Sequence, residues 1–168
     1  MGQSVSSVPF RIGHGWDTHR IEPGRPLILG GVTIPAEFGL AGHSDADVLS
    51  HAITDGLLGA LALGDIGMHF PDTAPEWKGA NSLDLLSHVL ALVLASGYKV
   101  VNVDSTVVLE RPKLQEYRLQ IRQSLADVLH LPKDSISVKF KTAEKLGPVG
   151  EGKSCEAHAV VLLLNTRQ

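Results

Sequence analysis

The sequence predicts an α/β sandwich of two layers, with one layer of helices packed on one face of a sheet. Segments rich in β-branched residues alternate along the chain with segments whose apolar residues recur every three or four positions. Hydrophobic residues make up 43% of the 168 residues and charged residues 20%, a composition typical of a globular protein with a sizeable core. We therefore expect one domain over residues 10–166, preceded by a flexible, small and polar segment at residues 1–9.

The first half of the chain should supply a strand, a hairpin and two helices. In order, these are a strand over residues 10–16, hairpin strands over 27–29 and 32–34, a helix from Ser44 to about Leu63, and a helix from Asn81 or Ser82 to just before Gly97. Gly30-Gly31 provides the hairpin turn. Ser44 is the expected N-cap of the first helix, with Asp47 three residues later. Gly97 suits the C′ position that ends the second helix.

The second half should add three strands and one helix. These are a strand over residues 98–109, a helix over 114–129, and strands over 136–140 and 157–164. The helix is predicted from apolar residues that share one face, namely Leu114, Tyr117, Ile121, Leu125 and Val128. Valine and leucine run consecutively through the last strand, which suggests that both of its faces are buried, one of them by another subunit.

Composition excludes several classes of function. The net charge is -3 and no run of Lys or Arg occurs, so nucleic acid is not an expected partner. No apolar stretch reaches the ~20 residues that a membrane span needs. The single cysteine, Cys155, excludes an internal disulfide and favours a reducing compartment, so we expect a cytoplasmic protein.

Residues of the types that bind metals concentrate in the first third of the chain. Asp17 and His19 stand two apart at the end of the first predicted strand, where alternation sends both side chains to the same side. His51 lies within the first predicted helix. Three such ligands with a fourth position left open are the pattern of a catalytic zinc site. The spacing alone also fits two ordinary loop residues and a hydrogen-bonded helix histidine.

Other polar segments suggest a phosphorylated substrate. His43 and Ser44 lie at the N-terminus of the first helix, where free N–H groups favour an anion, although simple capping would also explain Ser44. The turn at 64–72 carries two carboxylates that can accept hydrogen bonds from substrate hydroxyls. Lys113, near a helix start, could meet a phosphate as a point charge. Glu144, in a loop rich in donors, could hold Mg²⁺ together with substrate oxygens.

Taken together, the sequence resembles the 2-C-methyl-D-erythritol 2,4-cyclodiphosphate synthase family of the non-mevalonate isoprenoid pathway. The resemblance extends from Arg11 to Leu164. Seven ordered blocks carry it: RIGHGWDTH at 11–19, LGGVTIP at 29–35, HSDADV at 43–48 with His51 and Thr54-Asp55, GDIG at 64–67, FPDT at 70–73, PK at 112–113 and TAEKLG at 142–147.

The resemblance implies a role for each of these blocks. It implies that the catalytic Zn²⁺ is bound by Asp17, His19 and His51. It implies that His43 and Ser44 hold the 2-phosphate and that the phosphates are stabilised during catalysis by His43 and Thr142. Residues implied to contact substrate elsewhere are Asp17, Thr18 and His19, then Asp65, Ile66, Gly67, Phe70, Pro71 and Asp72 around the methylerythritol, and Lys113, Lys141, Thr142, Ala143 and Glu144 around the cytidine diphosphate. Glu144 is implied to bind the second metal, Mg²⁺ or Mn²⁺.

The resemblance also implies the fold, the assembly and the reaction. The expected subunit is a ferredoxin-like two-layer sandwich with a mainly four-stranded sheet, in a homotrimer whose active sites lie between neighbours. The expected reaction is attack of the 2-phosphate of 4-diphosphocytidyl-2-C-methyl-D-erythritol 2-phosphate on its own β-phosphate, with release of CMP. Two alternatives stay open from the residues: a zinc-dependent phosphohydrolase that activates water, and a non-catalytic trimeric nucleotide-binding module.

Overall fold

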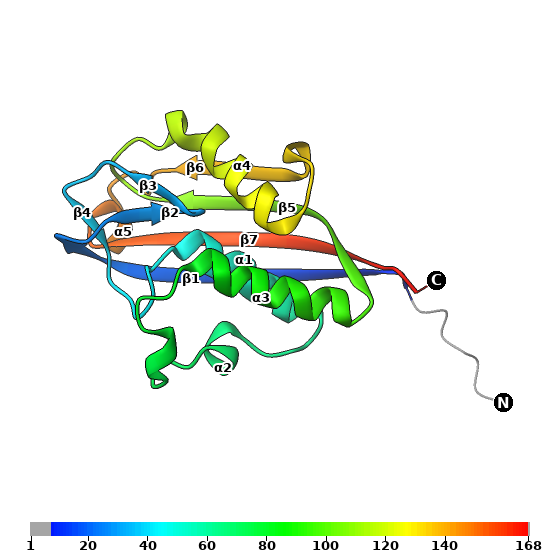
Figure 1. The fold of residues 1–168 in the computed structure, drawn as a ribbon. Helices are drawn as coiled ribbons and strands as arrows, with labels where there is room; N and C mark the ends of the chain where they lie inside the picture. Colours follow the sequence, from blue (N-terminus) through cyan, green and yellow to red (C-terminus); the bar gives the residue numbers. More distant parts are fainter. Residues whose placement is uncertain (1–7, 168) are drawn as a thin grey trace.

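The chain folds into a twisted sheet that carries its helices on one face (Figure 1). The computed structural model describes residues 8–167, so residues 1–7 of the predicted flexible segment lie outside the described part. In chain order the elements are β1 (Phe10–Pro23), β2 (Leu27–Leu29), β3 (Val32–Ile34), β4 (Phe38–Leu40), α1 (Val48–Ala60), α2 (Ile66–His69), α3 (Ser82–Ala95), β5 (Tyr98–Val108), α4 (Arg118–Leu129), β6 (Ile136–Lys141), α5 (Gly147–Gly150) and β7 (Ser154–Asn165). Short 3₁₀ turns lie at Pro75–Trp77, Gln115–Tyr117 and Lys133–Ser135.

The last strand along the chain lies in the centre of the sheet. The strand order is β4-β1-β7-β5-β6, with β7 antiparallel to both β1 and β5. Strands β5 and β6 are parallel and are joined by a crossover that contains α4. The expectation of a mainly four-stranded sheet is corrected to five strands, because the short β4 pairs with the end of β1 from Ile21 to Pro23. Strands β2 and β3 form a separate hairpin.

The helices bury one face of the sheet and leave the other open. Helix α1 packs directly on β1 and β7, α3 packs beside α1, and α4 covers β6 (Figure 1). The inward residues of β7 are buried, namely Cys155, Ala157, Ala159, Val161 and Leu163. On the opposite face Val160 is exposed, as are Phe10, Ile12 and Trp16 on the neighbouring β1. One face of the last strand is therefore buried within the chain, and burial of the other face by another subunit stays a prediction.

Two element boundaries near the metal-ligand residues differ from the sequence prediction. Strand β1 continues past residue 16 to Pro23 because β7 pairs with it as far as Arg20 and β4 pairs beyond. Asp17 and His19 therefore lie within a strand and not at its end. The N-cap of α1 is Asp47, not Ser44, because the Asp47 carboxylate accepts the Ser50 amide.

The other predicted elements agree with the structure except at their ends, whereas the short β4, α2 and α5 were not predicted. The hairpin strands lie where expected, and Asn81 caps α3 by accepting the amide of Leu83. Gly97 has a φ of 83°, as a C′ glycine requires. Helix α1 ends at Ala60, earlier than predicted, and Ala62 has a φ of 56°. Helix α4 starts at residue 118 and not at 114, since a 3₁₀ turn precedes it. Within residues 8–167, no helix has the length and apolarity to cross a membrane.

Candidate metal and phosphate site

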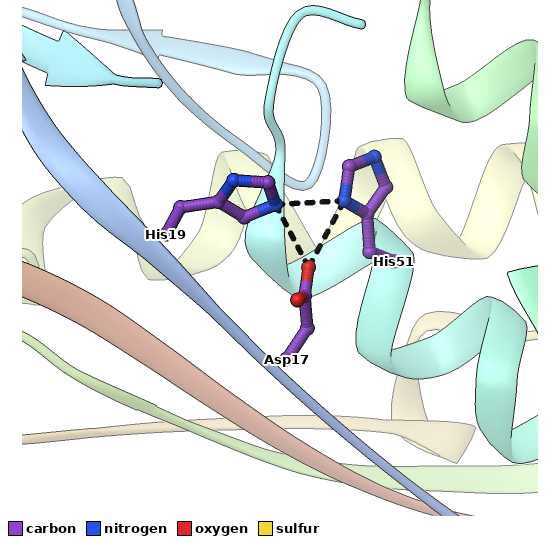
Figure 2. A group of neighbouring side chains, drawn as sticks. All are labelled: Asp17, His19 and His51. Atoms are coloured by element: carbon purple, nitrogen blue, oxygen red, sulfur yellow. Dashed lines mark hydrogen bonds and ion pairs between the residues drawn. The ribbon is translucent and has the colours of Figure 1, made fainter. Parts of the chain in front are cut away.

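Three side chains of metal-binding types meet where α1 crosses β1. Figure 2 shows Asp17 and His19 reaching from the strand toward His51 on the helix. The Asp17 Oδ2 atom lies 2.9 Å from His19 Nε2 and 3.0 Å from His51 Nδ1. The two nitrogen atoms are 3.1 Å apart. Four ligands around zinc at ~2.0–2.1 Å would lie about 3.3 Å from one another, so this triangle is close to one face of a zinc tetrahedron.

Two glycines of β1 allow the helix to come this close. A Cβ atom on Gly15 would stand 1.9 Å from the carbonyl oxygen of Ala52, and one on Gly13 would stand 1.8 Å from that of Gly56. Both contacts are with the backbone of α1, which cannot move aside as a side chain can. The backbone of the strand therefore lies directly against the backbone of the helix. This contact sets the distance between His51 on the helix and Asp17 on the strand.

We expect Gly15→Ala to destabilise the protein by at least about 1–3 kcal/mol, the usual cost of overpacking, because its Cβ meets a carbonyl oxygen. The measurement is the free energy of unfolding in urea. Gly59→Ala is the matched control, since its Cβ would lie 3.8 Å from the nearest atom, the His14 carbonyl oxygen. That change should stabilise α1 by roughly 0.5–1 kcal/mol. Equal stabilities of the two variants would contradict the close contact.

In each histidine, one ring nitrogen donates to a group outside the triad. The other ring nitrogen faces the triad without a proton and can accept a hydrogen bond or bind a metal. His19 Nδ1 lies 2.6 Å from the carbonyl oxygen of Ala41, which can only accept, so the proton of the neutral ring is on Nδ1. His51 Nε2 contacts the hydroxyl groups of Ser82 at 2.8 Å and Ser44 at 3.1 Å. With His51 donating through Nε2, its Nδ1 atom, His19 Nε2 and the Asp17 carboxylate are three acceptors that face one another. A cation satisfies all three at once, so the residues fit a bound metal.

Electrostatics at the site favour a charged carboxylate. Burial opposes ionisation of Asp17, but its contacts with His19 and His51 outweigh burial and hold its pKa far below the ordinary value. Burial also disfavours the charged form of His19, yet the contact with Asp17 raises the pKa of this histidine above the usual value. Asp17 therefore carries a full negative charge at neutral pH. The amide of Thr18 donates to its Oδ1 atom at 2.8 Å, which leaves Oδ2 facing the histidines.

The triad lines a cavity of about 250 Å³ with most of the predicted phosphate and methylerythritol residues. The full lining is Asp17, His19, His43, Ser44, His51, Ile66, Gly67, Phe70, Asp72, Trp77 and Leu85. His43 Nε2 is buried, and no described residue hydrogen-bonds to it. Buried polar atoms are usually paired, so an unpaired nitrogen beside the triad indicates a place for a polar ligand.

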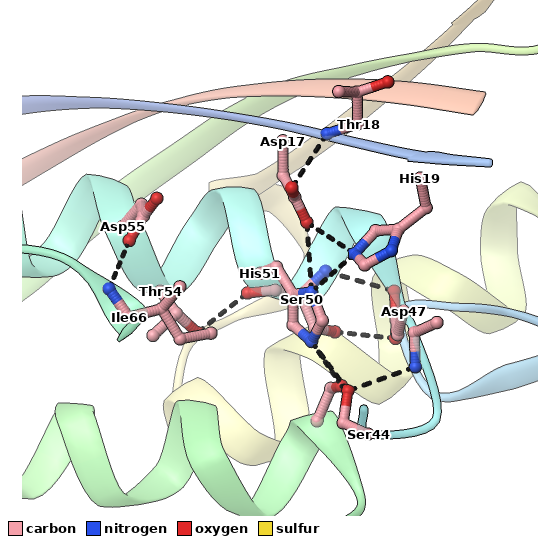
Figure 3. A network of polar contacts seen from close by, with 12 residues as sticks. Asp17, Thr18, His19, Ser44, Asp47, Ser50, His51, Thr54, Asp55 and Ile66 are labelled. Carbon is pink, nitrogen blue, oxygen red and sulfur yellow. Dashed lines mark hydrogen bonds and ion pairs between the residues drawn. The ribbon is translucent and has the colours of Figure 1, made fainter. Parts of the chain in front are cut away.

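The loop after α1 closes one side of this cavity. Asp65 caps α2 by accepting the amide of Met68 at 3.0 Å, and neither Asp65 nor Pro71 is a lining residue. Asp55 accepts the amide of Ile66 at 2.7 Å and so ties the loop to α1 (Figure 3). Burial and the nearby carboxylates of Asp17 and Asp65 raise the pKa of Asp55, against the effect of that hydrogen bond.

Another anchor lies behind the N-terminus of α1. The buried Asp47 carboxylate accepts from the amides of Gly30 and Gly31. It also accepts from the Ser50 amide and from the Ser50 hydroxyl group (Figure 3). Burial raises the pKa of Asp47, and these four bonds act in the opposite direction. The carboxylate therefore joins the turn of the β2–β3 hairpin to the first turn of the helix that carries His51.

The predicted cytidine-side residues form a second, separate group. Lys113, Lys141 and Thr142 line a cavity of about 160 Å³ beyond the ends of β5 and β6. Thr142 donates to Glu144 at 2.5 Å, and the amide of Ala143 donates to Glu110. The two cavities share no lining residue. Three strand spacings, about 14 Å, separate β1 from β6. One chain therefore does not bring the two predicted groups together.

Sequence reasoning missed several residues of the first cavity and its surroundings. Trp77 and Leu85 line the cavity, and Phe70 meets the Trp77 ring edge-on with 5.0 Å between ring centroids. A tryptophan in a polar loop is a signal that could have found the first of these. The sequence indicates Ser82 only as a helix start, although its side chain contacts His51.

Comparison with a family model and with known proteins identifies the family of this chain. A family model described as the YgbB family matches residues 10–164. The chain belongs to the YgbB family. This YgbB-family protein is 65% identical over 154 residues to the 2-C-methyl-D-erythritol 2,4-cyclodiphosphate synthase of Solibacter usitatus (strain Ellin6076), covering 92% of this chain and 97% of that one. The protein of the same name from Gloeobacter violaceus (strain ATCC 29082 / PCC 7421) is 59% identical over 160 residues, covering 95% and 98%.

Solved structures agree with this assignment. A 2C-methyl-D-erythritol-2,4-cyclodiphosphate synthase in a CDP-bound form superposes on the YgbB-family chain with a TM-score of 0.85 at 46% identity. The match covers 91% of this chain and 99% of that one. The family resemblance predicted from the seven sequence blocks is confirmed by these comparisons.

Proposed function

We propose that this YgbB-family protein is a 2-C-methyl-D-erythritol 2,4-cyclodiphosphate synthase. It would convert 4-diphosphocytidyl-2-C-methyl-D-erythritol 2-phosphate into 2-C-methyl-D-erythritol 2,4-cyclodiphosphate and CMP. The observation that carries the proposal is the convergence of three acceptor atoms, from Asp17, His19 and His51, in a cavity that also contains His43 and Ser44. The names of the relatives and the CDP-bound neighbour support the same activity.

Both reacting groups belong to one substrate, so the protein supplies position and charge and needs no nucleophile of its own. Holding the 2-phosphate beside the β-phosphate can contribute roughly 7–11 kcal/mol by proximity alone. His43 and Ser44 would hold the 2-phosphate, with the unpaired His43 Nε2 as one contact. The loop residues 65–67 and 70–72 would surround the methylerythritol, where Asp65 and Asp72 supply carboxylates for its hydroxyl groups.

Two metal ions fit this scheme. Asp17, His19 and His51 would hold zinc, which when bound supplies a Lewis acid for phosphoryl oxygens. Glu144 would supply the one carboxylate that Mg²⁺ or Mn²⁺ needs when substrate phosphates complete its coordination. Lys113, Lys141 and the backbone at Ala143 would contact the cytidine diphosphate, and the Thr142 hydroxyl group would meet the crowded phosphates. Thr18 would contribute by orienting the Asp17 carboxylate.

We infer that the active site is completed between subunits of a homotrimer. The two groups of predicted substrate contacts occupy separate cavities of one chain, so a single subunit holds two incomplete sites. The open face of β1 and β7 exposes apolar side chains, among them Ile12 at 72% exposed, Phe10 at 49% and Trp16 at 47%. Contact between copies through this face would bury them.

The proposal also includes a fold type for the subunit and a location in the cell. The subunit would be a ferredoxin-like two-layer sandwich, which the parallel β5–α4–β6 crossover and the single helical layer support. A cytoplasmic location is supported by the free, buried thiol group of Cys155, because unpaired cysteines are usual in reducing compartments.

Ile12→Lys should convert the assembly to monomers. The wild-type mass should be about 54 kDa, three times the 17.9 kDa of the chain. The variant should elute near the mass of one chain, because a charge on the open face would be desolvated in the interface. Light scattering after size exclusion measures both. Leu119→Lys, at a side chain 63% exposed on α4, is the matched control and should stay trimeric. A trimeric Ile12→Lys would place the interface elsewhere.

Phosphorus NMR of the purified protein with the cytidyl substrate and Mg²⁺ tests the activity. We expect cyclic diphosphate and CMP, lost when zinc is chelated and restored when zinc is added back. Linear phosphates in place of the cyclic product would mean a phosphohydrolase. Substrate left intact by metal-loaded protein would mean a nucleotide-binding module without turnover.

A further inference from the structure

A chain of polar contacts extends from His51 away from the cavity. The Ser82 hydroxyl group lies 2.8 Å from His51 Nε2 and is itself hydrogen-bonded to Asp45 Oδ1. The backbone amide of Ser82 donates to the other oxygen of Asp45 at 3.1 Å. Ser82 is fully buried, and neither Ser82 nor Asp45 lines the cavity. These two residues can therefore act on a bound ligand only through residues that do line the cavity, His51 first and Ser44 second, whose hydroxyl group lies 3.4 Å from that of Ser82.

The chemistry of the three groups fixes the direction of every proton in this chain. A carboxylate only accepts, so the Ser82 hydroxyl hydrogen points to Asp45. The Ser82 oxygen then presents a lone pair to His51, and Nε2 must carry the hydrogen that fills it. Ser44 Oγ, the other neighbour of Nε2 (Figure 3), accepts the Ala46 amide at 3.1 Å, and its own hydrogen has the Ser82 oxygen, 3.4 Å away, as an acceptor. The neutral imidazole of His51 is left with a bare Nδ1 that faces Asp17 and His19.

The two histidines of the triad are therefore held by different means. The ring of His19 donates to a main-chain carbonyl group, that of Ala41. The ring of His51 is held by side chains: its shorter contact, 2.8 Å, is with Ser82 at the start of α3, and its longer one, 3.1 Å, is with Ser44. Asp45, in the loop before α1, holds the Ser82 hydroxyl group in turn. A change to a side chain can remove the second support without moving the backbone. Supports of this kind orient metal-binding histidines in many proteins.

We propose that Ser82 and Asp45 are positioning residues that fix the tautomer of His51 and so set the metal affinity of the triad. The proposal rests on the metal site of the proposed function. A purely structural role is the competing explanation, because the same two segments are also joined by main-chain bonds, Asp45 to Ala80 at 3.0 Å and Gly79 to His43 at 2.8 Å. The test must therefore separate zinc affinity from stability.

The experiment measures the zinc dissociation constant of demetallated protein by competition with a chromophoric chelator, and the melting temperature of the same zinc-free samples. Ser82→Ala should bind zinc roughly 10–100-fold more weakly than wild type. Ser82→Thr keeps the hydroxyl group and should recover most of that loss. Ser87→Ala removes an exposed serine of the same helix and should leave zinc affinity unchanged.

Asp45→Asn gives an independent readout. An asparagine that keeps its oxygen on the Ser82 amide places its NH2 group on the Ser82 hydroxyl oxygen and gives up the 3.2 Å bond from the Asp47 amide. The hydroxyl hydrogen would then turn toward His51, and the ring proton would move to Nδ1. Nitrogen-15 NMR of the zinc-free protein, at a pH where the ring is neutral, should show the Nε2–H form of His51 in wild type and the Nδ1–H form in this variant. Zinc affinity should fall with that change.

The outcomes separate the two proposals. Wild-type protein that fails to bind zinc would overturn the metal site and the positioning role with it. Wild-type protein that binds zinc while Ser82→Ala binds equally well would overturn the positioning role alone. The positioning role is also overturned if both Ser82 variants lose zinc in proportion to their melting temperatures, with the His51 tautomer unchanged in Asp45→Asn.

Discussion

His51→Ala should leave the protein folded and unable to retain zinc. The change removes one of three protein ligands, and we expect zinc affinity to fall on the order of 1,000-fold or more. The imidazole is one of the few polar groups buried in the core, but the fold around it depends on the apolar contacts of α1 with β1 and β7. Elemental analysis of gel-filtered protein measures the bound metal, and circular dichroism checks the fold.

A second variant and a control make this result specific. Asp17→Asn changes the charge of the triad with almost no change in shape, and it should also lose zinc. His130→Asn removes an exposed imidazole at the end of α4, where the residue has a φ of 54° that asparagine tolerates. This control should keep full zinc occupancy. Full occupancy in His51→Ala would show that the metal is bound elsewhere.

Mixing two inactive variants should restore activity if each site is built by two subunits. His51→Ala lacks the metal-side half of the site, and a Lys113→Ala, Thr142→Ala double variant lacks the cytidine-side half. Three-quarters of randomly mixed trimers contain both kinds of chain, and each of these has one intact site of three. The mixture, unfolded and refolded together at equal amounts, should therefore reach roughly a quarter of wild-type activity.

The same experiment contains its own controls. Each variant refolded alone should stay inactive, and mixing without unfolding should restore activity only as fast as subunits exchange. CMP release is the measurement. A refolded mixture without activity, in a preparation that light scattering shows to be trimeric, would mean that both halves of each site come from one chain.

Local signals in the sequence predicted most elements of the fold. Gly30-Gly31 between two short apolar runs located the β2–β3 hairpin, and Asn81 with Gly97 bounded α3. Each of these features depends on residues within one turn or one helix. The extent of β1 beyond residue 16 could not be predicted in this way. Residues 17–20 pair with β7, more than 130 residues later in the chain, and residues 21–23 pair with β4.

The candidate site was predicted in part for the same reason. The alternation of side chains along a strand predicted that Asp17 and His19 lie on the same side. The structure confirms this and brings His51 to them. The close approach depends on Gly13 and Gly15 meeting carbonyl groups of α1, which no local pattern reveals. Ser44 has the side chain of a good N-cap, but its oxygen is used by Ala46 and His51, and Asp47 takes the capping position.

The central place of β7 determines when the protein can acquire its metal during synthesis. The ligands Asp17, His19 and His51 leave the ribosome early, but β1 has no partner along residues 10–20 until residues 154–164 are made. Until then both β1 and β5 present free edges, which favour aggregation. Zinc should therefore bind late, after translation has passed the last strand, and a chain stalled before residue 154 would hold all three ligands without the geometry to use them.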